Sequence, residues 1–431
     1  MVKKIQLDNG MVLVCQRLEG YKSVTIGVWV KTGSSNEAKH ENGMSHFIEH
    51  MVFKGTESRS AKDIAMEIDG IGGEINAYTA KECTCYYTKT MGANLEVGLD
   101  ILSDITIHPS FLSDNIETEK TVILDEISMY EDSAEELVDD IINGITFKNH
   151  PLSLPILGTK ETIMSFTREK VIEFYENHYR PDNMIISVAG DFDFEALESL
   201  ANKYFGDYKR VAHSESESTH KPEFNWGCNS KKKDFEQIQV AIEFPGIPFD
   251  HELSYDMTLL SNLFGGTNSS RLFQSIREDR GLAYSIYSEP NFYDEIGTLS
   301  VSFGVAKENL KETIKILSRE INRLITEGFS EKEIDHAKSH LRGSFVLGLE
   351  GSDQHMDLIG RIELFAHKEK SVADMLKKIE TVSLEGVQTL IRHCFTSGDF
   401  SLAIVGDITN EEVEKLYGVM KNSINQQGVK Q

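Results

Sequence analysis

Apolar residues with the two-residue period of a strand lie near both ends of the first 210 residues, and apolar residues with helical spacing fill the middle. The expected helices are residues 44–53, 61–69, 95–107, 113–142 and 168–177. The expected strands are a strand–turn–strand pattern at the N-terminus, residues 24–30, 74–80 and 83–90, and a closing strand from residue 183. This order predicts an α+β domain with one largely antiparallel sheet and helices packed on one face.

The second half of the chain repeats this pattern. An apolar strand that ends in a Gly-Asp pair and is followed by a helical stretch occurs twice, at Gly190 and at Gly406, which are 406 − 190 = 216 residues apart. Two further matching strands, residues 24–30 and 238–244, are offset by 238 − 24 = 214. Because this period is far longer than that of a solenoid repeat, the sequence predicts two homologous domains related by internal duplication.

A polar stretch without periodicity, residues 211–234, lies between the two halves. At 431 residues the chain is too long for one compact core, so two or three domains are expected. The polar stretch is rich in Ser, Glu and Lys, and we interpret it as a linker between a domain of residues 1–210 and a domain of residues 235–431.

The charge of the chain limits its partners. Lys+Arg number 44 and Asp+Glu 69, which gives a net charge of −25. A nucleic acid or an anionic membrane surface requires clustered cations, so we expect neither as a partner, whereas a basic peptide remains compatible with the charge.

The sequence also indicates the cellular compartment of the protein. The chain has no run near the ~18 apolar residues of a membrane span. Its first residues include two lysines without an apolar run of signal-peptide length, and its five cysteines follow no regular spacing. We therefore expect a cytoplasmic protein, in a bacterial cytosol rather than an organelle.

The motif with the clearest chemistry is His46-Phe47-Ile48-Glu49-His50. On a helix His46 and His50 lie one turn apart on the same side, which allows two imidazoles to bind one metal ion. Glu49 projects toward that ion and can accept a proton from water that the metal activates. The alternative is a helix with two histidines that are solvated or satisfied in the core.

A catalytic zinc site needs a third protein ligand, and the expected helix at residues 113–142 offers it. Glu119 and Glu126 are seven residues apart, two turns along one face, so both can point into one cleft. Spacing alone does not choose between them. The other acidic residues of this helix fit a solvated face.

These residues resemble a known family. The order H-x-x-E-H is the inverzincin signature, and residues 43–56, GMSHFIEHMVFKGT, are similar to the active-site helix of the pitrilysin/insulinase family, most of all its processing-peptidase branch. The resemblance implies one Zn²⁺ per chain and a third ligand about 76 residues after the second histidine. Here 126 − 50 = 76, which selects Glu126, and the family's auxiliary acidic residue falls on Glu119.

The resemblance also implies substrate contacts. Asn76 and Ala77 match the family's edge strand, which pairs with an extended peptide through its backbone. Arg277 and Tyr284 match an R-x-x-x-G-x-x-Y element that fixes the substrate and contacts the developing oxyanion. From residue type alone, Asn76-Ala77 fits a strand-end turn equally well, and Arg277 and Tyr284 fit an exposed helix residue and a strand aromatic better.

A shift of the metal motif by 214 to 216 residues reaches LSNLFGG, residues 260–266, which has neither His nor Glu. The resemblance therefore implies a catalytic first domain, an inactive second domain that presents substrate contacts, and a homodimer whose four domains enclose a chamber. The function expected is a zinc endopeptidase that cleaves peptides or unfolded segments, basic ones preferred. The alternatives are a catalytic subunit that needs a metal-free partner chain, a non-catalytic scaffold subunit and a structural zinc protein.

Overall fold

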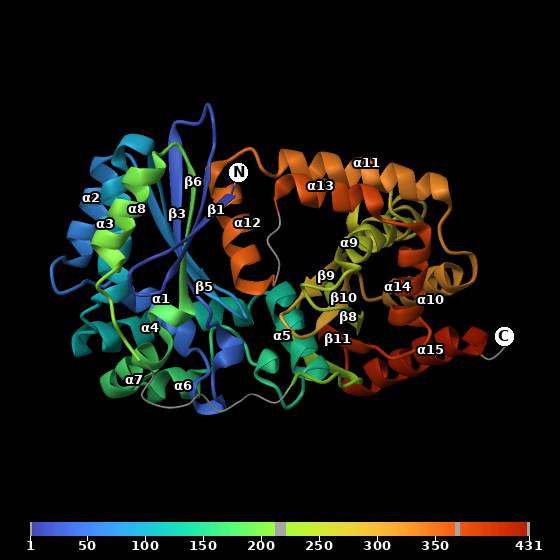
Figure 1. Ribbon diagram of the computed structural model, residues 1–431. Helices are drawn as coiled ribbons and strands as arrows, with labels where there is room; N and C mark the ends of the chain where they lie inside the picture. Colours follow the sequence, from blue (N-terminus) through green and yellow to red (C-terminus); the bar gives the residue numbers. More distant parts are fainter. Residues whose placement is uncertain (1, 212–220, 367–370, 429–431) are drawn as a thin grey trace. The chain divides into compact units, whose positions relative to one another are not determined.

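The computed structural model describes residues 2–211, 221–366 and 371–428, and it divides the chain into two compact units. The first comprises Met1–Ser128, Leu154–Thr219 and Val346–Ser371; the second comprises Met129–Ser153, His220–Phe345 and Val372–Gln431. Each unit contains one sheet and its own helices (Figure 1).

The sheet of the first unit has six strands in the order β1-β2-β6-β3-β5-β4. These strands are β1 (Val2–Gln6), β2 (Val12–Arg17), β3 (Ser23–Val30), β4 (Glu74–Thr79), β5 (Thr84–Met91) and β6 (Met184–Gly190). Only β2 and β6 pair in parallel. The helices are α1 (Met44–Val52), α2 (Ala61–Gly70), α3 (Leu95–Ile107), most of α4 (Ser113–Glu131), α6 (Lys160–Ser165), α7 (Arg168–His178), α8 (Phe194–Phe205) and α12 (Ser352–Phe365).

The sheet of the second unit has five strands in the order β7-β11-β8-β10-β9. These strands are β7 (Cys228–Lys232), β8 (Ile238–Pro245), β9 (Ala283–Phe292), β10 (Gly297–Val305) and β11 (Ser401–Gly406). The helices are α5 (Ala134–Thr146), α9 (Ser254–Ser261), α10 (Leu310–Glu327), α11 (Glu331–Leu347), α13 (Val372–Thr381), α14 (Leu384–Phe395) and α15 (Asn410–Gly428).

The two sheets share one topology. If β1 is set aside, β2-β6-β3-β5-β4 corresponds to β7-β11-β8-β10-β9, and in both sheets the first pair is parallel and the others antiparallel. The glycines that end β6 and β11 both have left-handed backbones, with φ of 135° at Gly190 and 146° at Gly406. The predicted α+β class and the internal duplication are confirmed.

Helices cover both faces of the first sheet, where one helical layer was predicted. Odd-numbered residues of β3 face α12: the Thr25 hydroxyl lies 2.8 Å from that of Ser352, and a Cβ added at Gly360 would meet the Trp29 ring at 2.4 Å. Even-numbered residues such as Ile26 form the main core with α1 and α3. Because successive side chains of a strand point to opposite faces, α12 occupies the face opposite α1 and α3.

The second sheet is covered in the same way. Ala241 and Val405 pack against Leu137 of α5, whereas Val240 and Ile404 belong to the core formed with α9, α10 and α14. Each sheet therefore receives one helix from the other half of the chain. For this reason the compact units are discontinuous and differ from the predicted division into residues 1–210 and 235–431.

Two local predictions were wrong. The expected linker at residues 211–234 contains a strand, β7, which pairs in parallel with β11 at the sheet edge; residues 212–220 lie outside the described ranges. The single helix expected at residues 113–142 is two helices, because Ser133 begins α5 by accepting the backbone N–H of Glu136 at 3.4 Å. Among the described residues, no helix has the length and apolar character to cross a membrane.

Candidate metal centre

Helix α1 presents the two histidines of the motif on one side. Its opposite side is anchored in the core by Phe47, Ile48 and Met51, which are buried. One turn of helix separates His46 from His50, and their ring centroids are 4.6 Å apart. Burial of the apolar face therefore fixes the direction in which both imidazoles point.

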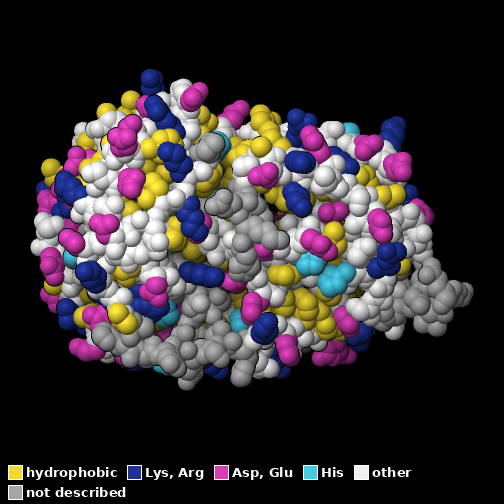
Figure 2. All heavy atoms as spheres, in the orientation of Figure 1, with side chains coloured by type: hydrophobic (Ala, Val, Ile, Leu, Met, Phe, Trp, Pro, Cys, Tyr) yellow, Lys and Arg dark blue, Asp and Glu magenta, His cyan; other side chains and the backbone are white. Residues whose placement is uncertain are grey.

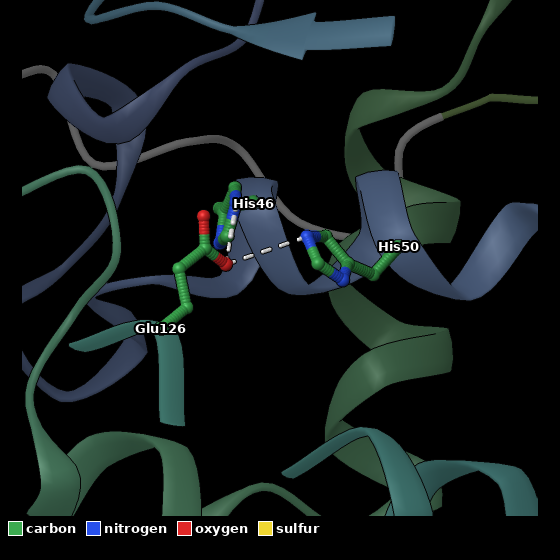
Figure 3. Close-up of side chains that lie close together, drawn as sticks. All are labelled: His46, His50 and Glu126. Atoms are coloured by element: carbon green, nitrogen blue, oxygen red, sulfur yellow. Dashed lines mark ion pairs between the residues drawn. The ribbon is translucent and has the colours of Figure 1, made fainter. Parts of the chain in front are cut away.

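Helix α4 supplies a carboxylate to the same place. One oxygen of Glu126, Oε2, lies 3.7 Å from Nε2 of His46 and 3.7 Å from Nε2 of His50 (Figure 3). Ligand atoms of the three residues all lie within 4.8 Å of one another, and this is the one such group in the part of the chain that the structure describes.

The donor set fits zinc. Two imidazole nitrogens and a carboxylate oxygen are the ligands of many catalytic zinc sites, which keep a fourth position open. A separation of 3.7 Å exceeds hydrogen-bond length. It is close to the ~3.4 Å between two ligands that each lie ~2.05 Å from one tetrahedral ion.

Glu119 contacts the His50 imidazole at Nδ1, the nitrogen that does not face Glu126. Its Oε1 lies 2.8 Å from Nδ1 of His50, and its Oε2 lies 2.7 Å from Nζ of Lys54. Glu119 is 1% exposed, so this carboxylate bridges an imidazole and an ammonium group away from water. A proton on Nδ1 that is donated to Glu119 leaves the lone pair of Nε2 free toward Glu126.

The pKa values of the two histidines shift in opposite directions. Burial, together with the nearby charge of His50, lowers the pKa of His46 to about 3. For His50 burial also favours the neutral form, but the hydrogen bond and charge of Glu119 outweigh it and raise the pKa. Nδ1 of His46 is buried without a hydrogen-bond partner in the described part of the chain, whereas its Nε2 lies 3.7 Å from Glu126.

Glu49 connects the metal helix to strand β4. The hydroxyl of Thr79, the last residue of β4, donates to Oε2 of Glu49 at 2.5 Å. Burial raises the pKa of Glu49, against the hydrogen bond from Thr79 and the charge of His50. A carboxylate with a raised pKa beside a metal site is suited to accept and return a proton.

Strand β4 is an edge of its sheet and pairs with β5 alone. Asn76 is exposed and Ala77 half-buried, and the Asn76 side chain accepts the backbone N–H of Ala77 at 2.8 Å. The outer edge of β4 is therefore the side on which an added peptide strand could pair.

Arg277 and Tyr284 belong to the second unit. The guanidinium of Arg277 lies over the rings of Phe273, at 4.7 Å, and Tyr284, at 5.2 Å. Tyr284 is 78% exposed and lies on β9, the edge strand that occupies the position of β4 in the duplicated topology. The structure brings these two residues together with each other, in a unit separate from that of the metal residues.

Comparisons with known proteins decide the family. Residues 12–160 match the family described as "Insulinase (Peptidase family M16)", and residues 165–341 match "Peptidase M16 inactive domain". An uncharacterized zinc protease of Bacillus subtilis, YmxG, is 38% identical over 95% of this chain and 99% of its own length. An uncharacterized zinc protease of Mycobacterium leprae is 34% identical over 95% of this chain and 93% of its own.

The chain belongs to the M16 peptidase family. The predicted resemblance is thereby confirmed, and the M16 relatives named zinc proteases support a zinc metallopeptidase at the level of the family. Within this M16 chain the H-x-x-E-H motif lies in the first matched region, and Arg277 and Tyr284 lie in the region described as inactive.

Two solved structures share this fold. A protease from Helicobacter pylori has a TM-score of 0.87 at 20% identity and covers 94% of this chain and 99% of its own. A peptidase M16 inactive domain from Pseudomonas fluorescens has a TM-score of 0.87 at 17% identity, with 95% and 98% covered.

Sequence reasoning did not identify two residues that support the M16 site. Lys54, which pairs with Glu119, lies in the turn after α1, and no local spacing rule relates it to a residue of α4. Glu37 binds the first turn of α1 from a preceding loop, and no local spacing rule indicates such a contact.

Proposed function

We propose that this chain is a zinc-dependent endopeptidase that hydrolyses peptides or unfolded polypeptide segments. The observation that carries the proposal is the position of Glu126 Oε2, at 3.7 Å from Nε2 of both histidines, with Glu119 at Nδ1 of His50. Bound at this site, zinc supplies Lewis acidity, which acidifies water and polarises a carbonyl group.

The residues of the chain divide the remaining tasks. Glu49 takes the proton of the attacking water and passes it to the leaving nitrogen, while the hydroxyl of Thr79 holds its carboxylate in place. Glu119 keeps His50 in the tautomer that presents Nε2. The edge of β4 at Asn76 and Ala77 pairs with the substrate backbone.

Two residues of the second unit, Arg277 and Tyr284, are proposed to contact the substrate. Tyr284 is highly exposed, and we assign it to the developing oxyanion and Arg277 to the substrate chain. Both residues could act within their own subunit, and we propose separately that a homodimer forms a closed chamber, with one Zn²⁺ per chain. Five free cysteines are consistent with a cytoplasmic enzyme.

Basic peptides are the proposed preferred substrates. The support is the net charge of −25, although acidic and basic side chains are interspersed over the visible face of each unit (Figure 2). Faster cleavage of a poly-acidic peptide than of a basic peptide of equal length would contradict this preference.

The test of the hydrolytic function is Glu49→Gln. This substitution preserves size and leaves all three proposed ligands in place, so the variant should bind one zinc per chain and lose hydrolysis by at least about 10²-fold. Cleavage sites in a peptide mixture, mapped by mass spectrometry with and without chelator, measure the loss. Retained turnover in Glu49→Gln would refute the general-base role.

Two rival functions differ in the quaternary assembly. A catalytic subunit that needs a partner chain is inactive when purified alone, and a scaffold subunit is inactive in every assembly. Gel filtration combined with the activity of the single purified chain separates both from the proposed homodimer.

A further inference from the structure

Glu37 is a buried carboxylate in the loop that leads to the metal helix. Its side chain is 1% exposed, and it lies directly after the short helix η1 (Ser34–Asn36). The metal helix α1 begins seven residues later at Met44, and its own N-cap residue, Gly43, has no side chain with which to cap it. The first backbone N–H groups of α1 therefore need an acceptor from elsewhere.

Glu37 supplies this acceptor with both oxygens. Oε2 accepts the N–H of Gly43 and Oε1 accepts the N–H of Ser45, each at 2.7 Å. The side-chain amide of Asn42 also donates to Oε2, at 3.2 Å. Burial raises the pKa of Glu37 to about 7, against these hydrogen bonds, so the group is ionised at pH 8. A negative charge at this end also stabilises the helix dipole.

The clamped turn is the one that carries the first histidine. Ser45, which donates to Glu37, is bonded directly to His46. Gly43 has a left-handed backbone, with φ of 93°, and a Cβ there would meet the backbone of Gly158 at 2.8 Å. The turn is thus held by tight backbone packing on one side and by the carboxylate on the other.

The loop that carries Glu37 is attached to the end of strand β4. The N–H of Ser34 donates to the carbonyl of Ala80 at 3.3 Å, and that of Ser35 donates to the carbonyl of Lys81 at 2.7 Å. A Cβ at Gly33 would meet the Ala80 carbonyl oxygen at 2.2 Å, so the two backbone segments are in direct contact. These contacts place the loop immediately beyond Thr79, the last residue of β4.

A second connection between α1 and β4 runs through Glu49, which accepts the hydroxyl of Thr79. The metal helix is therefore tied to the same end of β4 twice: at its N-terminal turn through Glu37 and the 33–35 loop, and in its last turns through Glu49.

We propose that Glu37 is a positioning residue for the zinc site: by binding the N-H groups of Gly43 and Ser45, it sets the position of His46 relative to Glu126 and to the edge of β4. The proposal rests on the zinc site of the proposed function. It differs from a simple cap because it requires the geometry of the metal site, and not only the stability of α1, to depend on this carboxylate.

The test compares Glu37→Gln with a matched cap variant, Asp193→Asn. Asp193 accepts the N–H groups of Glu195 and Ala196, both at 3.0 Å, at the start of α8, a helix of the same unit that carries no proposed site residue. Both substitutions exchange a capping carboxylate for an amide of equal size. Zinc affinity and the visible absorption spectrum of the cobalt-substituted protein are measured at pH 8, with the unfolding temperature as the measure of capping.

We expect Glu37→Gln to weaken zinc binding about tenfold and to change the cobalt spectrum, because both carboxylate oxygens of Glu37 accept backbone N–H groups and the amide keeps only one oxygen. Asp193→Asn should change neither and should alter the unfolding temperature little, because Oδ1 alone accepts both N–H groups there and Asn keeps it. Glu37→Asp, which keeps the charge on a shorter arm, should show the same two changes and serves if Glu37→Gln does not fold. Where peptidase activity is present, kcat should fall while KM stays within twofold of wild type.

Zinc affinity and a cobalt spectrum equal to wild type in either Glu37 variant would overturn the proposal. These readouts need no substrate, so absence of peptidase activity in the wild type would contradict the proposed function and not this inference.

Discussion

Glu119 Oε1 lies 2.8 Å from Nδ1 of His50, whereas Glu126 approaches the same ring at Nε2, at 3.7 Å. The two carboxylates therefore lie next to different nitrogens of one imidazole, Glu119 at Nδ1 and Glu126 at Nε2. An imidazole that donates from one nitrogen to a buried carboxylate offers a more basic lone pair at the other, which is the usual support for a metal ligand.

Glu119→Gln should weaken zinc binding by about 10- to 100-fold, because the amide NH₂ group can donate toward Nδ1 and favour the wrong tautomer of His50. Competition with a chromophoric chelator measures the affinity. Asp125→Asn is the control, since Asp125 is an exposed acid of the same helix. An unchanged affinity in Glu119→Gln would contradict the orienting role.

Zinc affinity should rise with pH with a slope that approaches one proton, not two. Zinc needs neutral imidazoles. The pKa of His50 is raised, so a proton competes there as the pH falls, whereas burial lowers the pKa of His46 to about 3 and this ring is neutral at pH 6 to 7. Calorimetry in buffers of different ionisation enthalpy counts the protons released. A slope near two in the range of pH 6 to 7 would contradict this expectation and would show that a second ligand also titrates there, either His46 or Glu126, whose pKa burial raises.

Removal of zinc should lower the stability of the first unit. A ligand that binds only the folded state at 100 times its Kd stabilises that state by about 2.7 kcal/mol. Differential scanning calorimetry with and without chelator should show the shift in one transition. Glu126→Gln, which removes a proposed ligand, should abolish this zinc-dependent shift. Mg²⁺ should not produce the shift in place of zinc, because hard cations prefer oxygen ligands. A full zinc shift in Glu126→Gln would exclude Glu126 as a ligand.

Gly360→Ala should destabilise the first unit by about 1–3 kcal/mol, because the new methyl group would meet the Trp29 ring at 2.4 Å. Gly343, also helical, has nothing within 4 Å of its hypothetical Cβ, so Gly343→Ala should be neutral or stabilise by up to about 1 kcal/mol. Urea denaturation measures both. Equal effects at the two positions would contradict the packing of α12 on the first sheet.

Local pattern predicted most of the secondary structure. Helix α3 has the predicted bounds of residues 95–107, because its apolar residues recur at helical spacing over its whole length. The break before α5 was also predictable, since Ser133 with Glu136 three residues later matches the N-terminal capping pattern. Strand β7 was not, because an edge strand with polar side chains does not differ in composition from a linker.

The exchange of helices between the halves was beyond sequence reasoning. The apolar residues of α5 and α12 show that each helix has a buried face, but the pattern does not say which sheet covers it. The discontinuous units follow from tertiary packing of segments far apart in the chain.

Some residues of the proposed metal site could be predicted from the sequence motif alone, and others could not. His46, Glu49 and His50 follow from one motif on one helix, which fixes their mutual spacing. The choice of Glu126 over Glu119 needed the family, because both lie on one face of α4, and the structure distinguishes them by which nitrogen of His50 each approaches. Arg277 lies in the other compact unit, so no spacing rule relates it to the motif.

We propose above all that one zinc ion is bound by His46, His50 and Glu126. A crystal structure of the zinc-loaded protein with anomalous data at the zinc edge tests it most directly. We expect one anomalous peak per chain, with both Nε2 atoms and a Glu126 carboxylate oxygen at ~2.0–2.2 Å from it. A peak elsewhere, or a peak bonded to the two histidines with Glu126 turned away, would contradict it.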